Sequence, residues 1–303
     1  MPALPSSAAE TEALYYRPGG PFEQNLPPIV PHAFRDEQAR ALRADAPTGM
    51  VALDLSESLK MPWPATTPVM LARYLVVRAG EELQHRFVAT GEIFYVIQGD
   101  GTTASGDTNF SWSPGDVFCL PGGRTTRHAA TSHAILLGVT NEPELAYQGL
   151  DAPAPERNPV RPVFFEAGKI DENLDAITDP LKTAGRAILL TASHLLATKA
   201  MIPSLSIAVN SLEPGCNQRP HRHNATALTL AIGWEGIHTR IDGERFDWFP
   251  YGVLLTPPRA VHSHHNMGTG MMRALVFQDG GLYYQYRNVG FSFEQPQPEG
   301  QTA

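Results

Sequence analysis

The chain has 303 residues, of which 42% are hydrophobic and 18% charged, a composition typical of a soluble protein with about two domains. The formal net charge of −8 argues against a nucleic-acid backbone or an anionic membrane as a partner. No apolar run approaches the ~18 residues of a membrane span. The two cysteines and the lack of a secretory signal lead us to expect a cytoplasmic protein without disulfides.

Composition divides the chain into five segments. Residues 1–50 are rich in Pro and Gly before a short helix expected over 34–44, and should form an arm that covers a domain or a neighbouring subunit. The other predicted segments are a first barrel over 51–145, a linker over 146–200 with a helix at about 187–200, a second barrel over 201–290 and a tail over 291–303. We expect this tail to be loose after Phe293.

Short apolar runs in both barrel segments have the features of β-strands. Residues 93–97 form a β-rich run that ends at Gly99, and residues 205–210 alternate between apolar and small or polar side chains. The sequence Ile-Asp-Gly-Glu at 241–244 predicts a tight hairpin, because Gly accepts a positive φ. Many short strands separated by turns are typical of a barrel or a sandwich, so we expect an all-β fold.

One pattern occurs twice with a constant offset of 136 positions. Such a long period implies two whole domains rather than small repeats. The pairs that this offset relates include His85 and His221, Arg86 and Arg222, Thr90 and Thr226, Trp112 and Trp248, Pro121 and Pro257, and His128 and His264.

The second copy of the pattern offers a metal site. His221 and His223 are two residues apart, so both imidazoles should leave the same face of an extended strand. His262 follows 39 positions after His223 and could supply a third nitrogen. Three neutral imidazoles leave a metal ion with open coordination positions. The affinity of the site for the metal should fall below about pH 6.5, because histidine is then protonated. His264 should face the same interior and could act as an acid or base.

These residues resemble the two motifs of the cupin superfamily. Gly215-x5-His221-x-His223 and Pro257-x4-His262 carry the resemblance, which implies a bicupin of two double-stranded β-helix (jelly-roll) barrels with a short N-terminal arm and a partly helical linker. By this resemblance the first barrel is degenerate: it keeps His85 and Glu92, but Phe87 and Thr126 stand in place of two histidines.

The second copy has Leu228 where the first has Glu92. A three-histidine site without that carboxylate resembles the gentisate, salicylate and 1-hydroxy-2-naphthoate group of ring-cleaving dioxygenases. The resemblance implies Fe(II), a small-molecule substrate, dioxygen and a homo-oligomer, a dimer or higher. Two features depart from it. Thr229 replaces an arginine implied to hold the substrate carboxylate, and the intact site lies in the C-terminal barrel rather than the N-terminal one.

The candidates for substrate binding are Asn210, Arg219, Trp234 and Gln278, with Arg273 as an alternative to Arg219. Asn210 is polar within an apolar alternation, and Gln278 follows an apolar run that could end at the barrel mouth. Trp234 could stack on a ring or could only pack in the barrel wall, and Arg219 or Arg273 could replace the missing arginine.

The leading hypothesis is a non-haem Fe(II) dioxygenase that acts on a hydroxylated aromatic or related enolisable compound. Three histidines serve Mn, Zn or Ni equally well, so a redox-neutral lyase, isomerase or decarboxylase stays open. A small-molecule-binding cupin without turnover stays open too.

Overall fold

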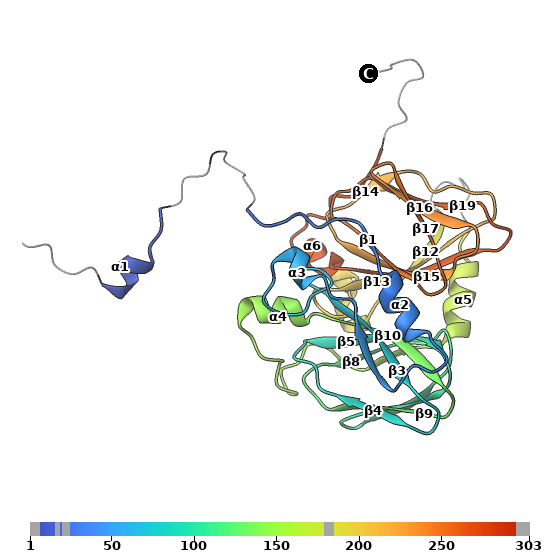
Figure 1. Ribbon diagram of the computed structural model, residues 1–303, viewed down its shortest axis with the longest axis horizontal. Coiled ribbons are helices and arrows are strands. Elements are labelled where there is room, and N and C mark those ends of the chain that lie inside the picture. The colour runs from blue at the N-terminus through green and yellow to red at the C-terminus, as the bar shows by residue number, and fades with distance from the viewer. Residues whose placement is uncertain (1–6, 16–18, 20–24, 179–184, 295–303) are drawn as a thin grey trace, which may run out of the picture.

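The computed structural model describes residues 7–15, 19, 25–178 and 185–294. It consists of two barrels, the first in blue to green and the second in yellow to red in Figure 1. The all-β prediction is confirmed, with short helices at the periphery: α1 (Ala8–Glu12), α2 (Arg35–Ala41), α3 (Ser56–Leu59), α4 (Glu142–Gln148), α5 (Ala167–Asp175), the 3-10 turn η1 (Ser193–Thr198) and α6 (Gly280–Gln285).

The first barrel is built from two antiparallel sheets. Its strands are β2 (Gly49–Ala52), β3 (Leu71–Val77), β4 (Glu82–His85), β5 (Gly91–Gln98), β6 (Gly101–Ser105), β7 (Thr108–Trp112), β8 (Val117–Pro121), β9 (Thr126–Ala130), β10 (Ala134–Thr140) and β11 (Val163–Phe165). The larger sheet has the order β11-β8-β5-β10-β3-β2, and the smaller has the order β4-β9-β6-β7.

The second barrel repeats this arrangement. Its strands are β1 (His32–Ala33), β12 (Arg186–Leu190), β13 (Ser206–Leu212), β14 (His221–Arg222), β15 (Ala227–Gly233), β16 (Ile237–Ile241), β17 (Glu244–Asp247), β18 (Val253–Thr256), β19 (His262–Asn266), β20 (Met272–Gln278) and β21 (Ser292–Phe293). The sheets have the orders β1-β18-β15-β20-β13-β12 and β17-β16-β19-β14-β21.

The offset found in the sequence recurs in the strands. β5 and β15, β6 and β16, and β9 and β19 each begin 136 residues apart. The predicted hairpin joins β16 to β17, where Ile241 pairs with Glu244. Asp242 and Gly243 at its turn have φ values of 47° and 89°, as a tight two-residue turn requires. The strands and turn predicted for these segments are confirmed.

Segments outside the two predicted barrels pair with barrel strands. In the arm, β1 pairs with β18, and the Gln38 amide donates to the carbonyl oxygen of Pro250 at 2.7 Å, so residues 32–41 cover the second barrel of the same chain. The helix predicted over 34–44 is α2. In the linker, β11 pairs with β8 and β12 pairs with β13. Parts of the predicted arm and linker therefore belong to the sheets of the barrels. The exact domain boundaries remain a prediction.

The helix predicted over 187–200 is wrong. Residues 186–190 form β12, whose Ile188 pairs with Val209 of β13, and the 3-10 turn η1 follows. Ala and Leu favour helix, but pairing at the sheet edge outweighs that local preference of less than ~1 kcal/mol per residue. The helix of the linker is α5 instead.

One apolar core runs between the larger sheets of the two barrels. Ile93 and Val117 of the first barrel and Val209 and Phe277 of the second belong to it, and all are buried. No helix in the described part of the chain is long and apolar enough to cross a membrane. This packing fixes the larger sheet of the second barrel, which forms one wall of the candidate site.

Candidate metal centre

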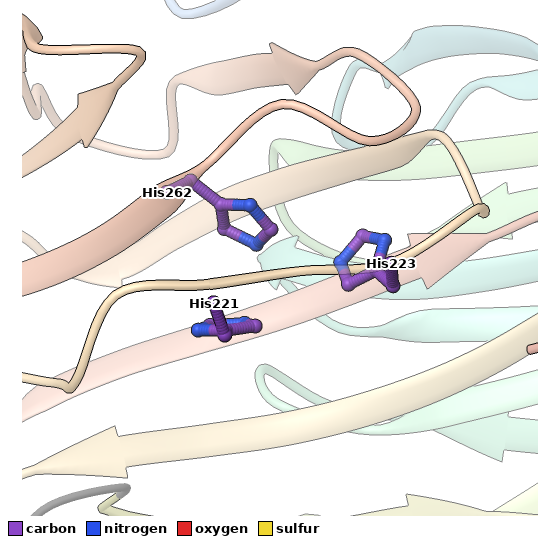
Figure 2. A group of neighbouring side chains, drawn as sticks. All are labelled: His221, His223 and His262. Atoms are coloured by element: carbon purple, nitrogen blue, oxygen red, sulfur yellow. The ribbon is translucent and has the colours of Figure 1, made fainter. Parts of the chain in front are cut away.

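The second barrel brings His221, His223 and His262 together. His221 of β14 lies directly opposite His262 of β19 in the strand register, and His223 follows at the end of β14. All three side chains are buried, and one ring nitrogen of each lies within 4.8 Å of those of the other two. Figure 2 shows the three rings gathered around a common space. The spacing seen in the sequence therefore corresponds to a real cluster.

Backbone carbonyls orient the three imidazoles. A carbonyl oxygen only accepts hydrogen bonds, so the Nδ1 atom that faces it must carry the proton. The second nitrogen of a neutral ring, Nε2, then keeps its lone pair. The bonds are His221 Nδ1 to Arg219 O at 3.1 Å, His223 Nδ1 to Ala225 O at 2.7 Å and His262 Nδ1 to Ala260 O at 2.9 Å. The same tautomer at all three positions suits a shared cation.

Burial keeps these rings neutral. It lowers the pKa of His221, and it lowers the pKa of His223 to about 4. The pKa of His262 falls to about 2 because burial is reinforced by the neighbouring His221 and His223. Leu228 stands where the first barrel has Glu92, and it is buried in the core between the barrels. Three neutral nitrogen donors fit Fe(II), Mn, Zn or Ni and leave positions open for other ligands.

A cavity of about 300 Å³ adjoins the cluster. Its walls come from both sheets of the barrel and from the C-terminal segment after β20. Besides the three histidines, its lining includes Ala208, Asn210, Gln218, Thr229, Thr256, His264, Val276, Gln278, Tyr283, Tyr284, Phe291 and Phe293. This mixture of aromatic walls and a few polar groups is typical of a small-molecule site.

Two of the predicted substrate residues line this cavity. Asn210 lies on β13, and its buried Oδ1 atom has no hydrogen-bond partner among the residues that the structure describes. Gln278 ends β20, and its Nε2 atom lies 3.1 Å from Nε2 of His223. A substrate role for both residues is compatible with their positions and stays a proposal.

The structure does not bring the other two into the cavity. Arg219 is exposed, donates to the carbonyl oxygen of Glu294 at 3.1 Å, and lies 4.8 Å from the centre of the Phe293 ring. Trp234 packs in an apolar cluster at the barrel wall. Arg273 points into a different cavity, where it pairs with Asp171 at 3.2 Å.

His264 lines the cavity from β19 but belongs to a different hydrogen-bond system from the three clustered rings. Its Nδ1 atom lies 2.8 Å from the Thr239 hydroxyl oxygen, which also accepts the Trp248 indole N–H at 2.8 Å. Burial lowers the pKa of His264 to about 3. The ring is therefore neutral and is held through its Nδ1 atom.

The sequence reasoning missed the part of the cavity formed by β21. This short strand pairs with β14, so that Phe293 lies opposite His221 in the register. Phe291 and Phe293 both line the cavity, and the sequence analysis gave neither of them a role there. Their spacing of two residues, which predicts one shared face of a strand, was an available signal. Residues 295–303 of this tail lie outside the described residues.

The first barrel has the same strand pairing around this position, with different side chains. His85 of β4 lies opposite Thr126 of β9, as His221 lies opposite His262. Phe87 stacks on His85 with 4.0 Å between ring centres and stands at the sequence position that corresponds to His223. Glu92 is fully buried, 3.9 Å from His85 Nδ1, and burial raises its pKa well above its usual value. At the positions that correspond to His223 and His262 this barrel therefore has a phenyl ring and a hydroxyl group instead of imidazoles.

Comparisons with known proteins agree with this arrangement. No protein-family profile matches the chain. A gentisate 1,2-dioxygenase from Haloferax sp. is 32% identical over 128 residues, which is 41% of this chain and 36% of that relative. The matched part is thus little more than a third of the relative's length.

Solved structures match over most of the chain. A salicylate 1,2-dioxygenase from Pseudaminobacter salicylatoxidans superimposes with a TM-score of 0.73 at 14% identity, covering 94% of both chains. A cupin 2 conserved barrel domain protein from Leptotrichia buccalis gives 0.52 at 14% identity, covering 84% of this chain and 97% of that one. The chain therefore has a bicupin fold, and it resembles the three-histidine ring-cleaving dioxygenases of the gentisate, salicylate and 1-hydroxy-2-naphthoate group.

Proposed function

We propose that this protein is a non-haem Fe(II) dioxygenase that cleaves a hydroxylated aromatic ring or a related enolisable small molecule. His221, His223 and His262 would hold the iron through their Nε2 atoms. The observation that carries the proposal is that Nδ1 of each of these three buried rings faces a backbone carbonyl oxygen beside one cavity that all three rings line. This contact places the ring proton on Nδ1 and leaves the lone pair on Nε2. When bound, Fe(II) would supply the redox-active Lewis acid at which substrate and dioxygen react.

The protein's own groups would bind and orient the substrate. Tyr283, Phe291 and Phe293 offer aromatic walls for a planar ring. The buried surroundings of His262 and His264 exclude bulk water, which strengthens polar contacts to the substrate. His264 would hold a substrate oxygen next to the metal.

The carboxylate pocket implied by the resemblance has changed. Thr229 is 2% exposed and lines the cavity at the place where the resemblance implies an arginine. A test panel should therefore pair acids such as gentisate and salicylate with uncharged dihydroxybenzenes, and should not assume a carboxylic acid.

Oxygen uptake by anaerobically Fe(II)-loaded protein tests the proposal. We expect at least one compound of the panel to consume dioxygen, with loss of its aromatic absorbance, and we expect His223→Ala to abolish both signals. Turnover without oxygen uptake by the Mn, Zn or Ni form would instead establish the redox-neutral class. Binding without turnover in every metal form would establish a binding protein.

A further inference from the structure

A three-residue hydrogen-bond relay occurs at equivalent places in the two barrels. In the second barrel, the Trp248 indole donates to the Thr239 hydroxyl at 2.8 Å, and that hydroxyl lies 2.8 Å from His264 Nδ1. In the first barrel the counterparts are Trp112, Thr103 and His128, with distances of 2.8 and 2.7 Å. Both barrels thus hold one histidine by the same chain of groups.

The donor and acceptor properties of these groups give the relay a direction. An indole nitrogen only donates, so Trp248 uses a lone pair of the Thr239 oxygen. The hydroxyl has one hydrogen of its own, and the Nδ1 atom of His264 is its other partner in the described chain. If Nδ1 carried the ring proton, the hydrogen of the fully buried Thr239 hydroxyl would be left without an acceptor. The arrangement that satisfies every group has Thr239 donating to Nδ1 and the proton of neutral His264 on Nε2.

The first barrel can satisfy the same direction. The Nε2 atom of His128 lies 3.1 Å from the Nε2 atom of His85, and such a pair requires one donor and one acceptor. With Thr103 donating to Nδ1 of His128, that ring carries its proton on Nε2 and donates to His85. In that arrangement the relay of the first barrel ends in an N–H that has an acceptor inside the protein.

In the second barrel, the corresponding ring lines the cavity next to the cluster of three histidines. We infer that Thr239 and Trp248 are positioning residues that hold His264 as an N–H donor toward the bound ligand. The ligand chemistry that fits is an oxygen with a free lone pair, such as a phenolate, enolate or carbonyl. This inference rests on the proposed site for its ligand, but the tautomer of His264 is a property of the chain alone.

The tautomer distinguishes His264 from the three clustered rings. His221, His223 and His262 carry their protons on Nδ1 and offer lone pairs, whereas His264 offers a hydrogen. His264 is therefore suited to donating to the ligand rather than to binding a cation through Nε2 or accepting a proton there. The sequence left these roles open.

Nitrogen-15 NMR of histidine-labelled, Zn(II)-loaded full-length protein tests the tautomer directly. We expect protonated Nε2 and unprotonated Nδ1 for His264, assigned by its loss in His264→Gln. Thr239→Val keeps the shape of the side chain but removes the hydroxyl, so the other tautomer should become populated, and Thr239→Ser should restore the native signal. A protonated Nδ1 atom in the unmodified protein would overturn the inference.

Binding of 4-nitrocatechol to the anaerobic Fe(II) form, followed by its absorbance shift, tests the positioning role without turnover. Thr239→Val should weaken binding about tenfold, the worth of one hydrogen bond, and Thr239→Ser should recover it. Thr103→Val, the matched change in the first barrel, should leave the affinity unchanged. Equal weakening by Thr103→Val, or no effect of Thr239→Val, would contradict the inference. A protein with the expected tautomer and binding but no oxygen uptake would refute the dioxygenase proposal alone.

Discussion

The side-chain amide of Gln278 lies 3.1 Å from Nε2 of His223, the ring nitrogen that the bond from Nδ1 to Ala225 leaves with a lone pair. The amide nitrogen donates to that lone pair, so a metal ion must replace this hydrogen bond in order to bind. Gln278 then becomes available to a ligand in the cavity. In the proposed function, the two residues would therefore link metal binding to the arrangement of the substrate pocket.

Replacing Gln278 by Leu should tighten metal binding. The variant loses a hydrogen bond that competes with the metal, and a bond of this kind is worth about 1 kcal/mol, or several-fold in affinity. Competition with a chelator of known affinity would measure the change for Zn(II) and Fe(II). Weaker binding by Gln278→Leu would show instead that the amide oxygen is itself a metal ligand.

Alanine at His221, His223 or His262 should remove the metal without unfolding the protein. Each ring supplies one of three donors, so its loss should lower metal affinity on the order of 100-fold or more. Elemental analysis of the purified variants gives the metal content, and circular dichroism checks the fold. His85→Ala is the matched control, because His85 has the same strand position in the first barrel, and it should keep a full complement of metal.

Metal should stay bound at lower pH than unperturbed histidines would allow. The ordinary value of 6.5 predicts loss of metal near that pH, but burial lowers the pKa of His223 to about 4 and that of His262 to about 2. Lowered pKa values leave the rings neutral, and so able to bind, as pH falls below 6.5. Metal content after equilibration across pH 4–7 would reveal the midpoint. If half of the metal were lost at pH 6.5 or above, the three imidazoles would have to be more exposed to solvent than they are in this structure.

Asp279 should make stability fall as pH rises. Burial raises its pKa from 3.8 to about 7, although its Oδ1 atom accepts the Thr226 N–H at 2.8 Å. Across this window the folded protein keeps a proton that the unfolded chain has released, so ionisation increasingly favours unfolding. Asp279→Asn keeps the acceptor and removes the charge. The variant should gain on the order of 2–4 kcal/mol relative to the parent between pH 4 and pH 8, measured by urea denaturation. A pH-independent difference between the two proteins would contradict this assignment.

The repeat made much of the fold and the cluster of three histidines predictable. The spacing of His221, His223 and His262 depends on strand geometry, and strand geometry has a fixed period of two. The offset of 136 between the two copies identifies Phe87 and Thr126 as the corresponding positions in the first barrel. These features follow from local pattern and duplication, and both can be recognised in the sequence alone.

Other features depend on contacts between distant segments. Nothing local distinguishes Asn210, which lines the cavity, from Trp234, which packs in the barrel wall. Arg219 lies within the motif in sequence, but its side chain contacts Phe293 and the backbone of Glu294 outside the cavity. Residues 186–190 became a strand because β13 offered an unpaired edge. Sequence patterns indicate which face a residue occupies, whereas the partner across that face is set by tertiary packing.

Anomalous X-ray scattering from crystals of the Fe(II)-loaded protein, collected on both sides of the iron edge, would test the central claim most directly. We expect one strong iron peak per chain at coordination distance from Nε2 of His221, His223 and His262, about 2.0–2.2 Å. No peak there, or a peak beside His85 and Glu92 in the first barrel, would contradict the account.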